Sequence, residues 1–245
     1  MTPTRQIRRL TLTLLLGVAT GLAQTAPATP YMNRNLIVLD PAHGNQDSGA
    51  TINNQPEKEI TLAFATTLKT LLTAKGFTVV STREAELPAV LTTDQRAGTA
   101  NHLRPVACIV LHATSTGDGV HIFTSSLPAT SDPYEPAAQI SWESAQTTYL
   151  AQSQHLANDL GLALVRTKVP AVLIRTALRP LDNLTCPAVA IELAPLKNGN
   201  HRPADEAYQQ RVADTLAAAL LTWRDLINPR PAPKAAPTPA AGATP

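Results

Sequence analysis

Short apolar runs alternate along the chain with longer stretches in which apolar residues recur every three or four positions. Short continuous runs are typical of strands buried on both faces, and the periodic stretches are typical of amphipathic helices. We expect strands at residues 36–39, 77–81, 108–111, 120–124, 171–176 and 188–191. We expect helices at residues 56–75, 91–100, 145–164 and 208–223. This alternation predicts an α/β domain with a mostly parallel sheet.

The first of these helices has the clearest boundaries. Pro56 stands where a helix is expected to begin, and proline is favoured at the first helical position. Ile60, Phe64 and Leu68 then recur on one face, and Gly76 is typical of a helix end. The boundaries predict that Glu57 lies in the first turn.

The two ends of the chain differ in composition from the part between them. Residues 1–23 combine Arg5, Arg8 and Arg9 with an uncharged apolar stretch, which predicts a signal peptide. The apolar stretch is shorter than the roughly 20 residues that span a bilayer, and an uncleaved anchor is the alternative. We therefore expect a periplasmic or secreted protein with no stable membrane span after cleavage. Residues 24–33 are expected to form a flexible lead, residues 34–227 a catalytic-sized domain, and residues 228–245 a disordered tail rich in Pro and Ala.

Charge and cysteine content narrow the class of protein further. The net charge is only +2 and 4% of residues are aromatic, which argues against a nucleic-acid binder. In an exported chain an oxidising compartment permits a disulfide between Cys108 and Cys186. Two separate buried thiols are the alternative, which the spacing leaves open.

Polar residues follow three of the expected strands. His43 comes after the first strand, His112 ends the third, and Glu192 ends the last. Glu57 lies at the start of the first helix. In parallel α/β sheets, sites form beyond the carboxyl ends of the strands, so we expect these four side chains to converge on one cleft.

Two imidazoles and a carboxylate suit zinc, with water in the fourth place. A further carboxylate, Glu192, is available as the base that takes a proton from water and returns it to a leaving group. The residues predict hydrolysis of an amide or similar acyl bond. Each also has an ordinary structural interpretation, because no compact motif links them: Glu57 can complement a helix dipole, and Glu192 can pair with a surface cation.

The order of the local motifs resembles that of a known family. Residues 36–58 read LIVLDPAHGNQDSGATINNQPEK. This segment is similar to the DPGHGG-D-GA and EK motifs of the zinc-dependent N-acetylmuramoyl-L-alanine amidases of bacterial cell walls. The likeness continues, in the family's order, at residues 76–83, 96–101, 110–113, 119–125 and 187–198.

The resemblance implies roles for the four residues. His43, Glu57 and His112 match the three ligands of one zinc ion per chain, and Glu192 matches the catalytic glutamate. It also implies a single domain with a twisted, mostly parallel six-stranded sheet flanked by helices on both faces. The implied reaction is cleavage of the amide between N-acetylmuramic acid and L-alanine, so the expected partners are the stem peptide and glycan of peptidoglycan.

The chain departs from the family pattern at four positions, which are Ala42, Asn45, Thr114 and Pro195. The departures concern substrate preference and rate rather than the reaction class, because every ligand is retained. The departures at Asn45, Thr114 and Pro195 motivate one alternative, a non-catalytic cell-wall binding or regulatory protein on an amidase fold. A further alternative keeps the enzyme but changes the bond that it cleaves, which gives a zinc carboxypeptidase.

Several other residues are expected to have supporting roles. Asp47 is expected to support the loop after His43, by hydrogen bonds or by orienting the ligand. Arg83 is expected to form a structural ion pair, with a clamp on a substrate carboxylate as the alternative. Asn198 either shapes the cleft or caps a loop. The remaining histidines are expected to be structural or exposed, away from the metal, and they are His102, His121, His155 and His201.

Some family members carry a helix that covers the zinc until a partner removes it. The corresponding region here is residues 127–146, which includes Glu135 and Glu143 as candidate caps. The region is short and rich in Pro, Ser and Ala, which argues against such a helix. We expect a monomer, and an activating protein is one further partner to consider.

Overall fold

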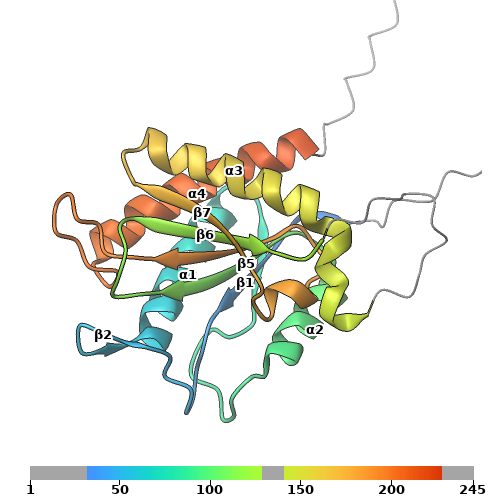
Figure 1. Ribbon diagram of the computed structural model, residues 1–245, viewed down its shortest axis with the longest axis horizontal. Coiled ribbons are helices and arrows are strands. Elements are labelled where there is room, and N and C mark those ends of the chain that lie inside the picture. The colour runs from blue at the N-terminus through green and yellow to red at the C-terminus, as the bar shows by residue number, and fades with distance from the viewer. Residues whose placement is uncertain (1–31, 129–140, 228–245) are drawn as a thin grey trace, which may run out of the picture. The chain divides into compact units, whose positions relative to one another are not determined.

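A six-stranded sheet forms the centre of the protein (Figure 1). The computed structural model describes residues 32–128 and 141–227. The strands are β1 (Asn33–Pro41), β4 (Thr78–Ser81), β5 (Pro105–Ala113), β6 (Val120–Ser125), β7 (Ala171–Thr176) and β8 (Ala188–Leu193). The predicted signal peptide, the tail and all but the last two residues of the predicted lead lie outside the described residues. Asn33 belongs to β1 and not to the lead, because it pairs with Pro105.

The strand directions define one edge of the sheet where a site can form. The strand order is β4-β1-β5-β8-β6-β7, and every neighbouring pair is parallel except β6 and β8. The carboxyl ends of β1, β5 and β8 therefore lie at one edge together with the amino-terminal end of β6. The sequence-based expectation of a mostly parallel six-stranded sheet is confirmed.

Helices cover both faces of this sheet, as expected (Figure 1). On one face, α1 (Glu57–Ala74), α3 (Leu150–Arg166) and α4 (Glu206–Ile227) enclose the larger core. On the other, α2 (Thr93–Leu103) and the short 3-10 helix η2 (Leu181–Asn183) enclose a smaller one. Successive strand residues point to opposite faces, so Ile37 and Leu39 enter the first core while Val38 enters the second.

A tight hairpin leads the chain into α1. It joins β2 (Thr51–Ile52) to β3 (Gln55–Pro56), and both turn residues, Asn53 and Asn54, have positive φ, as this kind of turn requires. Pro56 is the residue before the helix rather than its first residue, so α1 begins at Glu57. Gly76, with φ +82°, follows the helix end as expected. The hairpin thus places Glu57 in the first turn of α1.

The expected helix 145–164 is wrong in its first turn. Residues Trp142–Tyr149 form a 3-10 helix, η1, with a non-helical kink at Ser144. The side chain of Gln146 is buried there and donates to the carbonyl oxygens of Leu184 and Cys186. These contacts tie η1 to the segment before β8, and the regular helix begins only at Leu150.

A disulfide joins Cys108 to Cys186, with an S–S distance of 2.04 Å. It links β5 to the segment that enters β8, two neighbouring strands of the sheet. The interpretation of two separate thiols is therefore wrong.

Within the described ranges, none of the helices combines the length and the apolar character needed to cross a membrane.

Candidate metal centre

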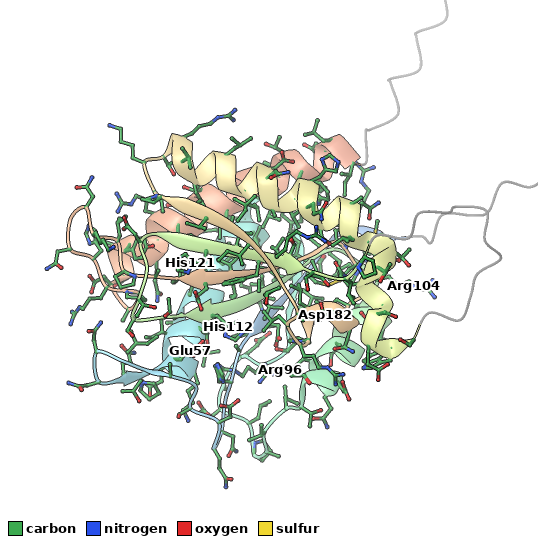
Figure 2. All side chains as sticks on the ribbon, viewed as in Figure 1. Glu57, Arg96, Arg104, His112, His121 and Asp182 are labelled. Carbon is green, nitrogen blue, oxygen red and sulfur yellow. A yellow bond between two sulfur atoms is a disulfide. The ribbon has the colours of Figure 1, made fainter. Side chains whose placement is uncertain are left out.

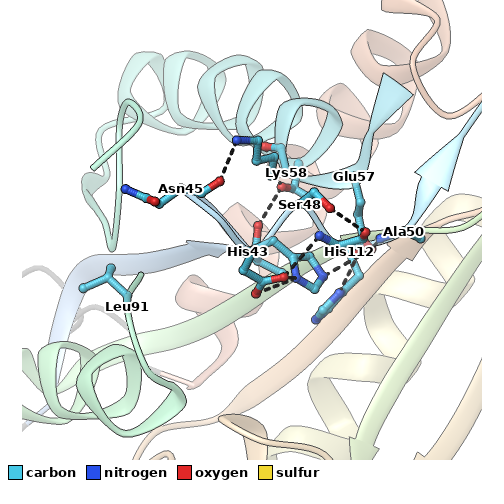
Figure 3. A network of polar contacts seen from close by, with 12 residues as sticks. His43, Asn45, Ser48, Ala50, Glu57, Lys58, Leu91 and His112 are labelled. Carbon is cyan, nitrogen blue, oxygen red and sulfur yellow. Dashed lines mark hydrogen bonds and ion pairs between the residues drawn. The ribbon is translucent and has the colours of Figure 1, made fainter. Parts of the chain in front are cut away.

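His43, Glu57 and His112 come together at the edge of the sheet where β1 and β5 end (Figure 3). One potential ligand atom from each lies within 4.8 Å of the other two. Nε2 of His43 is 3.2 Å from Oε2 of Glu57, and Nδ1 of His112 is 2.8 Å from Oε1 of the same carboxylate. The loop after β1, the start of α1 and the end of β5 thus each supply one side chain, as the sequence predicted.

The carboxylate of Glu57 is buried and held by donors on both oxygens. The backbone amide of Ala50 donates to Oε2 at 3.0 Å, and that of Ala113 donates to Oε1 at 3.1 Å. Burial raises the pKa of Glu57, but the hydrogen bonds with His112 and His43, reinforced by the two amides, outweigh it and hold the pKa far below its ordinary value. These contacts favour the ionised form of Glu57.

Asp47 fixes the orientation of the His43 ring. Both carboxylate oxygens of Asp47 lie 2.9 Å from Nδ1 of His43, which leaves Nε2 directed at Glu57. The hydrogen bond with Glu57 raises the pKa of His43 above its ordinary value, and Asp47 adds to this against the effect of burial. A carboxylate behind an imidazole is the usual way to orient a metal-binding histidine, so the prediction for Asp47 is confirmed as a contact.

Gly49 leaves the space in which the side chains of His43 and Glu57 meet. Its φ of +64° favours glycine, and a Cβ there would lie 2.6 Å from Cδ2 of His43 and 2.7 Å from Oε2 of Glu57. A side chain at this position would push His43 and Glu57 apart.

Two buried arginines hold the backbone of the loop that carries His43. Arg96 bonds the carboxylate of Asp40 at 2.7 Å and donates to the carbonyl of His43, also at 2.7 Å. Arg83, only 2% exposed, donates to the carbonyls of Pro41 and Lys58. Within the described residues, Arg83 bonds backbone oxygens and the hydroxyl of Thr61 and forms no ion pair with a carboxylate, so the expected structural ion pair is not found.

The local conformation accounts for two of the departures from the family pattern. Among the residues with positive φ are His43 at +65° and Asn45 at +55°, but not Ala42. Alanine is therefore tolerated before His43, and asparagine suits the left-handed region better than most residues. Nζ of Lys58 donates to the carbonyl of Asn45 at 2.8 Å, as Figure 3 shows.

Glu192 lies beside the cluster in the sheet register. It pairs with His112 of β5 on one side and with His121 of β6 on the other. The neighbours of His112, His121 and Glu192 along their strands point into the larger core. These three side chains therefore point to the opposite face of the sheet, the one that α2 covers. Figure 2 shows His112 and His121 at the same end of the sheet, with Glu57 next to them.

The expectation that His121 lies away from the cleft is wrong. Its Nδ1 is 2.7 Å from Oε2 of Glu192. The error has a physical cause: β6 runs antiparallel to β8, so the start of β6 lies at the edge where β8 ends. The sequence held a signal, because residues 114–119 are too short a connection for a parallel crossover, which needs a dozen or more residues.

The other candidates lie apart from the ligand cluster. His102, His155 and Asn198 are exposed, and His201 stacks on Tyr208 with ring centroids 6.2 Å apart. Glu143 is exposed on η1 and is not part of the cluster, while Glu135 lies outside the described residues.

A cluster of two imidazoles and one buried carboxylate, at the carboxyl edge of an α/β sheet and next to a second carboxylate, is of the kind that metal-dependent hydrolases use. The family model described as N-acetylmuramoyl-L-alanine amidase matches residues 37–222. The chain belongs to this family, which confirms the resemblance drawn from its motifs.

Individual relatives agree with this assignment. The chain is 25% identical to N-acetylmuramoyl-L-alanine amidase Rv3717 of Mycobacterium tuberculosis, over 80% of this chain and 87% of that protein. Its fold is similar to that of the amidase Ami1 from Mycobacterium smegmatis, with a TM-score of 0.62, 20% identity, and coverage of 78% and 97%. It is also similar to the CwlD amidase from Clostridioides difficile, solved in complex with the GerS lipoprotein, with a TM-score of 0.54, 19% identity, and coverage of 78% and 99%.

Proposed function

We propose that this protein is a zinc-dependent amidase that cleaves the bond between N-acetylmuramic acid and L-alanine in peptidoglycan. The observation that carries the proposal is the convergence of His43, Glu57 and His112 within 4.8 Å, in a chain of the amidase family. Glu192 in the adjacent register position supplies the second carboxylate that the chemistry needs.

The donor set fits one zinc ion. Tetrahedral zinc with ligand distances of about 2.0–2.1 Å needs ligand atoms roughly 3.3 Å apart. The separations from Glu57, 3.2 Å to His43 and 2.8 Å to His112, are close to this value. Two imidazoles and a buried carboxylate whose ligand atoms face one another form a donor set that a divalent cation would complete, which supports a resident metal. When bound there, zinc supplies an activated water at neutral pH and polarises the scissile carbonyl.

The residues of the chain divide the remaining work. His43, Glu57 and His112 hold the metal, and Asp47 keeps the ring of His43 turned toward it. Glu192 takes a proton from the attacking water and returns it to the nitrogen of the leaving L-alanine. Its side chain is 24% exposed, so it is accessible to a substrate at the edge of the sheet.

The expected setting follows from the substrate. The predicted signal peptide and the disulfide support export to the periplasm or beyond, where peptidoglycan is found. The stem peptide and glycan are the proposed partners of a monomer. An activating protein is a further proposal, supported by the relative solved with a lipoprotein.

The test uses purified protein with its native metal and isolated sacculi. We expect about one zinc per chain and products with a free L-alanine N-terminus, detected by mass spectrometry. Glu192→Gln should keep the zinc and lower turnover by about 10²–10⁴-fold, the usual contribution of a positioned base. Asp214→Asn, an exposed carboxylate on α4, is the control.

Each alternative has its own outcome. Release of C-terminal residues from the stem peptide would show a carboxypeptidase. Binding to sacculi without turnover, in zinc-loaded protein, would show a wall-binding protein. Full activity of Glu192→Gln would contradict the assigned mechanism.

A further inference from the structure

A single side chain holds the proposed base. Nδ1 of His121 lies 2.7 Å from Oε2 of Glu192, and in the described part of the chain no other side chain is hydrogen-bonded to that carboxylate. His121 is directly across from Glu192 in the antiparallel register, so the contact follows from the pairing of the two strands and not from a flexible loop.

The imidazole ring of His121 is seated from two sides. Gly117 has φ +98°, and a Cβ on it would lie 2.4 Å from Cε1 and 2.5 Å from Nε2 of His121. The ring of Phe123 meets that of His121 edge-on, with centroids 6.4 Å apart. Only 16% of the His121 side chain is exposed. The backbone at Gly117 and the ring of Phe123 therefore limit how the imidazole can turn, while its Nδ1 faces the carboxylate.

We propose that His121 is a positioning residue for Glu192. Nδ1–H of His121 donates to Oε2 of Glu192, which fixes the carboxylate plane and leaves Oε1 as the oxygen that exchanges a proton with water and the leaving nitrogen. The proposal rests on the proposed role of Glu192. It differs from a purely structural cross-strand pair because it predicts an effect on turnover and none on folding or metal content.

Two substitutions separate the hydrogen bond from the shape of the side chain. His121→Phe fills the ring space but has no donor. His121→Asn places an amide N–H where Nδ1 lies, at the same number of bonds from Cα. The same two substitutions at His155, which is exposed on α3, serve as matched controls.

In zinc-loaded enzyme, we expect His121→Phe to lower kcat by about 10- to 100-fold, because a base misplaced by about 1 Å is costly. KM and zinc content should stay within about twofold, and His121→Asn should recover most of the lost kcat. Unchanged kcat in His121→Phe, or equal losses in both variants, would overturn the proposal. Loss of zinc or of folded protein in both variants would show a structural role instead.

A second measurement does not depend on turnover. Nitrogen-15 NMR of the histidine side chains should show a proton on Nδ1 of His121 in the wild type, and a larger share of the Nε2–H form in Glu192→Ala. A bare Nδ1 in the wild type contradicts the proposed contact.

The two proposals fail differently. If Glu192→Gln is inactive and His121→Phe is fully active, only the role of His121 is wrong. If zinc-loaded wild type and Glu192→Gln turn over equally, the mechanism assigned to Glu192 is wrong, and the role of His121 fails with it.

Discussion

The two carboxylates of the site are held in opposite ways. Glu57, on the side of β1 and α1, is in contact with two imidazoles and two backbone amides, and 6% of its side chain is exposed. Glu192, on the side of β8 and β6, has one side-chain partner among the described residues and is 24% exposed. The two are brought to the same edge of one sheet, yet their surroundings differ in both burial and number of donors.

This difference matches the roles proposed for the two groups. A metal ligand has to stay ionised and fixed, and several donors to a buried carboxylate favour the charged form. A base has to gain and lose a proton in each cycle, and many donors would oppose the protonated state. On the proposed roles, the number of hydrogen bonds to a carboxylate separates the ligand from the base, although both lie at one edge of the sheet.

The largest effect is expected when the heavily bonded carboxylate is removed. Glu57→Ala should abolish zinc retention and lower turnover by at least about 10³-fold, because the metal contributes several kcal/mol to the reaction. Metal analysis and product release from sacculi are the measurements. Glu59→Ala, an exposed carboxylate in the same turn of α1, is the control. Zinc retained at the wild-type level in Glu57→Ala would contradict the assignment of the ligands.

A smaller effect on zinc binding is expected from Asp47, which contacts His43 and is not itself a proposed ligand. Asp47→Ala removes the group that orients His43 and should weaken zinc binding by about 10- to 100-fold. A competition titration with a chelator of known affinity measures it, with Asp214→Ala as the control. If Asp47→Ala changed kcat while the zinc affinity remained the same, Asp47 would act on the reaction and not on the ligand.

The smallest effect is expected at the start of α2, which carries Arg96. Thr92 and Gln95 form a reciprocal capping box, so Thr92→Ala should lower the free energy of unfolding by about 1 kcal/mol. Thr99→Ala, in the same helix, is the control and should change it by less than about 0.5 kcal/mol. Urea unfolding measures both. Zinc affinity should be unchanged, because Arg96 itself remains; a large loss would mean that the support of this loop is more sensitive than the contacts indicate.

The sequence predicted the elements better than it predicted their directions. Apolar runs located β1, β5 and β8 and the polar residues after them, because burial on both faces leaves a clear pattern. An apolar run has the same pattern in a parallel and in an antiparallel strand, so it did not reveal that β6 is antiparallel to β8. His121 was consequently assigned to the wrong place.

Contacts between residues far apart in the sequence could not be predicted either. Arg83 and Arg96 bond backbone oxygens about 40 to 55 positions away, at Pro41 and His43. A carbonyl oxygen is present at every residue, so no residue type in the sequence marks which one a buried arginine will meet. The clustering of His43, Glu57 and His112 could be predicted because imidazoles and carboxylates are chemically distinct and each of these residues lies at the end of a predicted strand or at the start of a predicted helix.

The reversed strand has a consequence for how the protein can change during evolution. Side chains alternate between the two faces of β6, so inserting or deleting one residue in the connection 114–119 with a shift of register would turn His121 away from Glu192 and bring an apolar neighbour, Val120 or Ile122, to its place. Most surface connections tolerate changes of length. In the connection 114–119, a change of length would also disturb the contact between His121 and Glu192. We therefore expect this connection to vary by substitution of residues and not by insertion or deletion.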